Sequence, residues 1–188
     1  MLPGGDRPVS APPIPLPGRD GGITLVTGPR GSGKSSLCMR WAEEARRVGM
    51  DVAGLVTLGI WTSAEKTGLQ ALDLRAGERR GLARLAAGAG GVAPLGRWAF
   101  DHETLEWGAD VLRAACPTGL LVIDELGPLE LLRSQGWHCA LEVLQAGAFG
   151  AAVAVVRPSL VKAAQSVVPA RCVIRLGGDG TWQAHLPL

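Results

Sequence analysis

The sequence of 188 residues lacks the features that identify several large classes of protein. No uninterrupted apolar run is long enough to predict a membrane-spanning helix, and the first residues show no charged-then-apolar signal pattern. The cysteines form no Cys-x-x-Cys pair, which favours free thiols over disulfides or a zinc site; they are Cys38, Cys116, Cys139 and Cys172. These absences predict a cytoplasmic protein with no membrane partner.

Charge and rare residue types narrow the choice of partners further. The formal net charge of +2 gives no reason to expect a nucleic-acid partner. Tyrosine and asparagine are absent, and lysine occurs only at Lys34, Lys66 and Lys162 although arginine is common. Because lysine is so rare in this chain, a lysine at a motif position is poorly explained by chance.

Residues 1–22 are rich in proline and glycine, which leaves little chance of a helix or a central strand. We predict a flexible arm over residues 1–22 and a single domain over residues 23–188, since the length fits one domain. A proline-rich arm also suits a proline-binding module, so attachment of a protein partner through the arm stays open.

The strongest motif in the chain lies between an apolar run at residues 23–27 and a helical pattern at residues 35–47. It fits G-x-x-x-x-G-K-S/T, the loop whose glycines and backbone N–H groups wrap a phosphate chain. We expect Lys34 to reach the β- and γ-phosphates as a catalytic residue and the Ser35 hydroxyl to hold Mg²⁺. The predicted nucleotide-binding residues are Gly28, Pro29, Arg30, Gly31, Ser32, Gly33, Lys34, Ser35 and Ser36.

A second acidic element follows the continuous apolar run at residues 119–123. Such a run is typical of a strand buried on both faces of a parallel sheet. Asp124 ends it and is the candidate carboxylate for Mg²⁺. Glu125 is placed to orient and deprotonate an attacking water. Glu130 either extends this acidic cluster or caps the next helix.

The remaining pattern alternates strands with helices and predicts a three-layer α/β/α fold with a mostly parallel central sheet. Further strands are expected at residues 51–58, 69–74, 98–100, 151–156 and 172–176, and further helices at 102–116, 137–146 and 159–165. A polar turn is expected at residues 61–68 and a small-residue loop at 86–96. Ligands bind at the carboxyl ends of strands in such sheets, where Gly28, Asp124 and Arg157 would meet.

Several other side chains admit two interpretations. Arg157 ends a buried strand, so it is either a catalytic contact to the γ-phosphate or one half of a surface salt bridge. Arg79, Arg80 and Arg84 form either a lid over phosphates or a solvated basic face. The remaining candidates are two histidines expected to be structural, His102 and His138, and two tryptophans beside expected loops, Trp61 and Trp98.

In the order and spacing of its motifs the chain resembles the THEP1-type nucleoside-triphosphatases, a small family of phosphate-loop proteins. The specific part is the string Asp124-Glu125-Leu126-Gly127-Pro128-Leu129-Glu130-Leu131. Supporting segments are residues 28–35, 52–57, 66–68, 71–73, 82–84 and 96–98, so the likeness runs from about Gly22 to about Arg157. The resemblance implies slow hydrolysis of nucleoside triphosphates with Mg²⁺ and broad specificity.

We therefore expect Mg²⁺-dependent hydrolysis of ATP or GTP, with broad base specificity, to diphosphate and phosphate. The chain has no N/T-K-x-D motif for guanine and no H-R-D-x-x-x-x-N motif of protein kinases. Two alternatives stay open: a nucleotide or nucleoside kinase of the same fold, and a nucleotide-dependent adaptor with little turnover.

Overall fold

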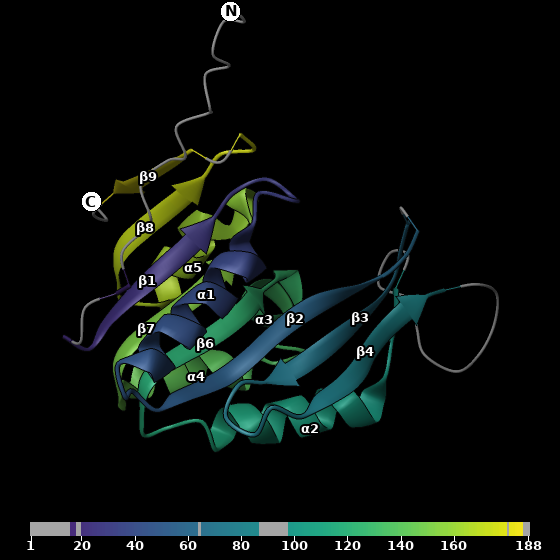
Figure 1. The fold of residues 1–188 in the computed structure, drawn as a ribbon, viewed down its shortest axis with the longest axis horizontal. Coiled ribbons are helices and arrows are strands. Elements are labelled where there is room, and N and C mark those ends of the chain that lie inside the picture. Colours follow the sequence, from purple (N-terminus) through teal and green to yellow (C-terminus); the bar gives the residue numbers. More distant parts are fainter. Residues whose placement is uncertain (1–15, 18–19, 64, 87–97, 180, 186–188) are drawn as a thin grey trace, which may run out of the picture.

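The computed structural model describes residues 16–17, 20–63, 65–86, 98–179 and 181–185 (Figure 1). Its strands are β1 Gly22–Thr27, β2 Val52–Thr62, β3 Glu65–Asp73, β4 Arg79–Leu85, β5 Trp98–Phe100, β6 Thr118–Leu126, β7 Phe149–Val156, β8 Ala170–Leu176 and β9 Trp182–His185. Its helices are α1 Lys34–Arg47, α2 His102–Arg113, α3 Pro128–Arg133, α4 Cys139–Ala146, the 3₁₀ turn η1 Pro158–Leu160 and α5 Val161–Val167.

All the described strands join one sheet in the order β5-β4-β3-β2-β6-β7-β1-β8-β9. The central strands β2, β6, β7, β1 and β8 run parallel to one another. Antiparallel strands extend the sheet at both edges, β3 to β5 on one side and β9 on the other. The α/β fold is as predicted, with a parallel centre in a mixed sheet.

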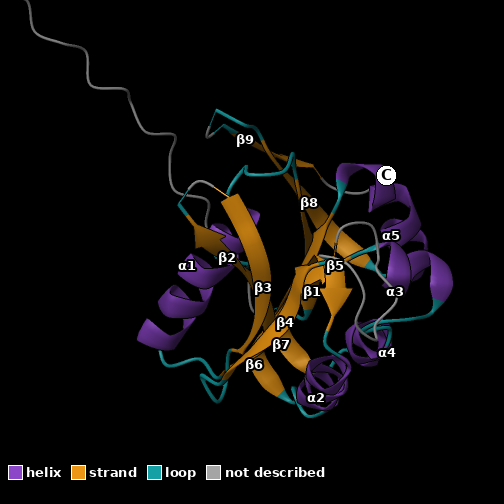
Figure 2. Cartoon of the chain, turned by 90° about the vertical axis from the view of Figure 1, so that its right-hand side faces the viewer, coloured by secondary structure: helices purple, strands orange, loops and turns teal. Residues whose placement is uncertain are grey.

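Two apolar clusters cover the faces of the sheet. Leu121 and Ile123 of β6 pack with α2, α4 and α5, whereas Leu120 and Val122 pack with α1. Successive side chains of a strand point to opposite faces, so an unbroken apolar run is what a strand buried on both sides requires. Figure 2 shows α1 on one face and the other helices on the opposite face, which confirms the three layers.

The segment from residue 61 to residue 68 is not a polar turn. It forms the end of β2 and the start of β3, which pair antiparallel from Leu55↔Asp73 to Thr62↔Glu65. Ser63 turns the chain with φ 55°, in the left-handed region. Burial falls along both strands toward the turn, and residues 60–62 and 65 are exposed, so this end of the hairpin lacks the buried apolar run that revealed the central strands.

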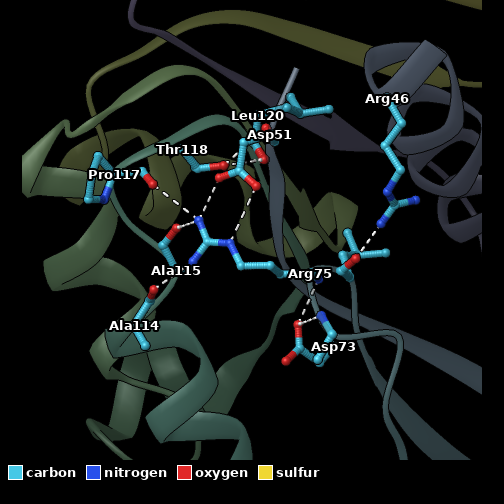
Figure 3. A network of polar contacts seen from close by, with 11 residues as sticks. Arg46, Asp51, Asp73, Arg75, Ala114, Ala115, Pro117, Thr118 and Leu120 are labelled. Atoms are coloured by element: carbon cyan, nitrogen blue, oxygen red, sulfur yellow. Dashed lines mark hydrogen bonds and ion pairs between the residues drawn. The ribbon is translucent and has the colours of Figure 1, made fainter. Parts of the chain in front are cut away.

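The predicted helix over residues 102–116 ends at Arg113, and the helix expected from residue 137 begins at Cys139. Asp101 caps α2, because its carboxylate accepts a hydrogen bond from the Thr104 N–H at 2.8 Å. The chain beyond α2 turns through residues 114–117, where Arg75 binds three of the backbone carbonyls (Figure 3).

The arm predicted over residues 1–22 needs one correction. Gly22 belongs to β1, and Leu16 is half-buried against the cluster formed by α1 and the sheet. The burial of Leu16 ties the chain just before β1 to the core. Residues 1–15, most of the arm, and residues 87–97, most of the expected small-residue loop, lie outside the described residues.

No helix in the part of the chain that the structure describes is both long and apolar enough to cross a membrane. The four cysteines are free thiols, with Cys38 and Cys139 buried and Cys116 and Cys172 partly buried. This agrees with the interpretation of the cysteines as unpaired.

Candidate active site

The predicted phosphate loop, residues 28–35, connects β1 to α1. Gly28 has φ 153°, and a Cβ there would lie 2.5 Å from the Leu176 carbonyl oxygen, so the loop presses directly on β8. Gly33 precedes α1 with φ 87°, a conformation that favours glycine. No side chain caps α1 and its first turn holds no acidic residue. The N–H groups at this helix end are therefore suited to an anion.

Lys34 folds back over the same loop. Its ammonium donates hydrogen bonds to the carbonyl oxygens of Gly28 at 2.9 Å and Pro29 at 2.7 Å. Both partners belong to the loop itself, so the charge of Lys34 stays beside the glycines and the start of α1. The loop thus combines one cation with a positive helix end, which is the electrostatic requirement for binding phosphate.

Asp124 is buried, with 4% of its surface exposed. It follows Ile123 on β6, and the alternation of the strand directs its side chain toward α1, on the same face as Val122. Burial raises its pKa to about 6, and Glu125 adds repulsion, while a hydrogen bond from Ser35 opposes the rise. The Thr57 hydroxyl holds the Asp124 carbonyl at 2.8 Å.

The donor atoms around Asp124 fit a hard divalent cation. Among the described residues, Asp124 Oδ2 is buried and has no hydrogen-bond partner. Buried polar oxygens are normally paired, so an unpaired carboxylate oxygen beside a serine hydroxyl indicates a ligand. Hydroxyl and carboxylate oxygens are the ligands that Mg²⁺ takes together with phosphate and water. Ser35 and Asp124, the predicted metal ligands, are thus brought together.

Two further oxygens near this region are buried without a partner among the described residues, Ser32 Oγ and Thr27 Oγ1. Ser32 was predicted as part of the phosphate loop. Thr27 and Thr57 were missed. Thr27 ends β1, a position that the sequence signalled. Thr57 lies within β2, just beyond its pairing with β6, and only the structure places it beside Asp124.

Glu125 and Arg157 face each other across neighbouring strands. Arg157 follows β7, which pairs with β1, so its expected position beside the loop strand is confirmed. Although β7 is buried, 59% of the Arg157 side chain is exposed. The guanidinium Nε donates to Glu125 Oε1 in an ion pair, and the Glu125 side chain is 33% exposed. A salt bridge to a carboxylate therefore exists, and its partner is the predicted general base.

Glu130 is a structural cap. Its carboxylate accepts hydrogen bonds from the N–H groups of Gly127 at 2.9 Å and Trp137 at 3.0 Å, and its side chain is buried. The Glu130 carbonyl lies 2.9 Å from His138 Nδ1. The capping interpretation of Glu130 is thus confirmed, and His138 serves the same local structure.

The arginine group at residues 79–84 lies on β4, which two strands separate from β6. Arg80 pairs with Glu78 at 2.8 Å and stacks 4.7 Å from the Trp107 ring. These arginines therefore extend from a strand and not from a loop. Of the other candidates, His102 pairs with Glu106 at 3.3 Å, Trp98 lies on the edge strand β5, and Trp61 is 61% exposed near the hairpin turn.

The sheet order, the glycine loop before α1 and the buried aspartate on a neighbouring strand define the phosphate-loop NTPase fold. A sequence model of a family described as NTPase matches residues 23–168. Proteins named nucleoside-triphosphatase THEP1 are similar to the chain in sequence. The chain belongs to the THEP1-type nucleoside-triphosphatase family.

Two archaeal relatives illustrate the match. The THEP1 of Pyrococcus abyssi is 36% identical over 108 residues, which are 56% of this chain and 59% of that protein. The THEP1 of Thermococcus kodakarensis is 34% identical over 125 residues, 64% of this chain and 69% of that protein. The match to the Archaeoglobus fulgidus THEP1 covers 61% of its length. The chain thus spans less than two thirds of the length of several of these relatives.

Two solved structures share the fold. The crystal structure of THEP1 from the hyperthermophile Aquifex aeolicus aligns with a TM-score of 0.60 at 19% identity, covering 84% of this chain and 91% of that one. The solution structure of a human cancer-related nucleoside triphosphatase aligns with a TM-score of 0.58 at 24% identity, covering 77% and 84%. At these identities the likeness concerns the fold alone.

Proposed function

We propose that the chain hydrolyses nucleoside triphosphates to the diphosphate and phosphate, with Mg²⁺ as cofactor and with both ATP and GTP as substrates. One observation carries this proposal: the buried Asp124 leaves Oδ2 unpaired beside the Ser35 hydroxyl, at the start of a helix whose loop holds Lys34. A carboxylate, a hydroxyl and a lysine in this arrangement are the parts that phosphoryl transfer requires.

The side chains divide the work by position. The N–H groups of the loop and the Lys34 ammonium would bind the β- and γ-phosphates. Ser35 and Asp124 would hold Mg²⁺, which when bound neutralises charge on the phosphate oxygens. Phosphate groups and Mg²⁺ are common to every nucleoside triphosphate substrate, so these contacts support broad base specificity.

Glu125 is the proposed general base. It follows Asp124 directly, and its side chain is partly exposed where Asp124 is buried, so it is open to a water molecule. In the reaction the water oxygen forms a bond to the γ-phosphorus while the bond from that phosphorus to the β,γ-bridging oxygen breaks. Glu125 accepts the proton of the water, and the diphosphate leaves with the bridging oxygen.

The test is phosphate release from ATP, GTP, CTP and UTP, with and without Mg²⁺ and with and without a nucleoside acceptor. We expect Mg²⁺-dependent release from all four and no phosphorylated nucleoside. Transfer to the acceptor would identify a kinase, whose candidate lid, residues 79–84, lies in strand β4. No release from any triphosphate, with nucleotide still bound, would favour the adaptor.

A matched pair of variants tests the assignment of the base. Glu125→Gln should keep nucleotide binding and lower kcat about 10²-fold, the usual scale for loss of a general base. Glu142→Gln makes the same chemical change at an exposed position of α4 and should leave kcat unchanged. Turnover of Glu125→Gln at the wild-type rate would show that another group takes the proton.

A further inference from the structure

We propose that Arg157 is a positioning residue, which sets the direction of the Glu125 carboxylate while its free donors bind the γ-phosphate. The proposal rests on the proposed hydrolysis and adds a residue that acts through the general base. It also predicts that the site distinguishes triphosphates from diphosphates, because only a triphosphate has the γ-phosphate that binds Arg157 and thereby orients Glu125.

The order of the strands places Arg157 between the two halves of the site. The phosphate loop follows β1 and the carboxylates lie on β6, and β7 is the strand between them. Arg157 is the first residue after β7, so it leaves the sheet at the edge where loop and carboxylates meet. No other arginine among the described residues directly follows a strand that pairs with both β1 and β6.

The backbone at Arg157 is held firmly. Pro158 begins η1 directly after it, and the Leu160 N–H donates to the Arg157 carbonyl at 2.9 Å. Proline fixes its own φ and restricts the residue before it to extended backbone, and Arg157 has φ −65° and ψ 148°. Because the backbone of Arg157 is restrained, the guanidinium changes position only by rotation of its side chain. A residue that orients the Glu125 side chain needs such a restrained backbone.

The Arg157 guanidinium has N–H groups that make no hydrogen bond within the described residues. Its Nε holds Glu125 Oε1, and within the described part of the chain neither of its terminal nitrogens donates a hydrogen bond to protein. A guanidinium carries five N–H groups in a planar fork, so one side can hold a carboxylate while the other binds phosphate oxygens. The side chain is 59% exposed, so these remaining donors are accessible to a ligand.

The consequence for catalysis lies in the chemical step. An exposed ion pair alone is weak, so in the absence of triphosphate it restrains Glu125 only loosely. Phosphate oxygens on the second side of the fork would fix the plane of the guanidinium and hence the rotamer of Glu125. Alignment of this kind changes kcat, because it sets the geometry of the water and its base. It changes diphosphate affinity little, since the γ-phosphate is missing.

The first test is a double-mutant cycle on kcat with Arg157→Lys and Glu125→Gln. Lysine keeps the charge and lacks the planar fork. We expect Arg157→Lys to lower kcat about 10-fold or more with KM within about 3-fold, and to lower kcat by less than about 2-fold in the Glu125→Gln background. Equal effects in both backgrounds would show that Arg157 does not act through Glu125. Arg171→Lys, at an exposed ion pair with Asp20, is the control.

The second test needs no turnover. With ¹⁵N-labelled arginine, hydrogen exchange of the Arg157 Nε–H is measured with Mg²⁺ and either ADP or the non-hydrolysable β,γ-imido analogue of ATP. We expect slower exchange with the analogue than with ADP, and loss of this difference in Glu125→Gln. The same exchange rate with both nucleotides would overturn the proposal. A wild-type protein that releases no phosphate would instead refute the proposed hydrolysis, while this measurement would still decide the role of Arg157.

Discussion

Two polar clusters at opposite ends of the sheet differ in how completely their atoms are paired. At the amino end, Arg75 donates to the carbonyls of Ala114, Ala115 and Pro117 at 2.7 to 3.1 Å and to the Asp51 carboxylate at 2.7 Å (Figure 3). At the carboxyl end, buried oxygens of Thr27, Ser32 and Asp124 have no protein partner within the described residues. A paired cluster stabilises the fold, whereas an unpaired one costs stability and leaves capacity for a ligand.

This comparison predicts the largest effect at Lys34. Lys34→Ala should lower kcat/KM by about 10³-fold, because the charge that meets the β- and γ-phosphates is lost. Within the described part of the chain, the Lys34 ammonium donates hydrogen bonds only to carbonyls of its own loop, so urea unfolding should be almost unchanged. Lys162→Ala is the control for removal of an exposed lysine. Unchanged triphosphate hydrolysis in Lys34→Ala would contradict the assignment of the phosphate loop.

The next largest effect concerns Asp124, where binding and stability should change in opposite directions. The folded pKa of about 6 lies above the ordinary aspartate pKa of 3.8, so its contribution to stability is present below about pH 4 and lost as the pH rises through 6. Without metal, Asp124→Asn should therefore gain up to about 3 kcal/mol over wild type at about pH 8 and little at about pH 4.

Urea unfolding at both pH values with a chelator measures this gain, and Asp110→Asn, an exposed carboxylate on α2, is the control. Addition of Mg²⁺ and nucleotide should stabilise the wild type and stabilise Asp124→Asn much less. A variant that is destabilised at every pH would show that Asp124 is a structural residue.

At the paired cluster we expect the reverse pattern. Arg75→Ala should lower the free energy of unfolding by about 1–2 kcal/mol, since several carbonyls lose their donor at once. The kcat for triphosphate should stay within about 2-fold, since the network lies at the opposite end of the strands. Arg75→Lys keeps a charge beside Asp51 and should lose less stability. A large fall in kcat with unchanged stability would break the distinction between the two clusters.

The smallest expected effect is at the start of α2. Asp101→Ala removes the acceptor of the Thr104 N–H and should cost about 1 kcal/mol of unfolding free energy. The hydrogen bond from Thr104 lowers the pKa of Asp101, so this contribution is present near neutral pH and lost as the pH falls through that lowered pKa. Asp101→Asn, which can still accept the hydrogen bond, should keep most of the stability both near neutral pH and at a pH below the lowered pKa of Asp101.

The sequence predicted those parts of the site that depend on neighbouring residues. It did not predict contacts between segments that are far apart in the chain. The phosphate loop and Asp124 were predictable because glycine spacing and an unbroken apolar run are properties of neighbouring residues. The ion pair of Glu125 and Arg157 joins residues 32 positions apart and depends on β6 lying beside β7, which the sequence does not state. The inner parts of β2 and β3 were predicted as strands, but the outer end of their hairpin was missed because it is exposed and carries no long apolar run.

The position of β7 has one more consequence, for how the site tolerates change. Because β1 and β6 each pair with β7, the phosphate loop and the carboxylates are two strand spacings apart, about 10 Å. Backbone hydrogen bonds fix that span, and every residue type except proline contributes to them in the same way. The interior residues of β7 can therefore be replaced by other apolar residues of suitable size while the distance between the phosphate loop and the carboxylates stays constant.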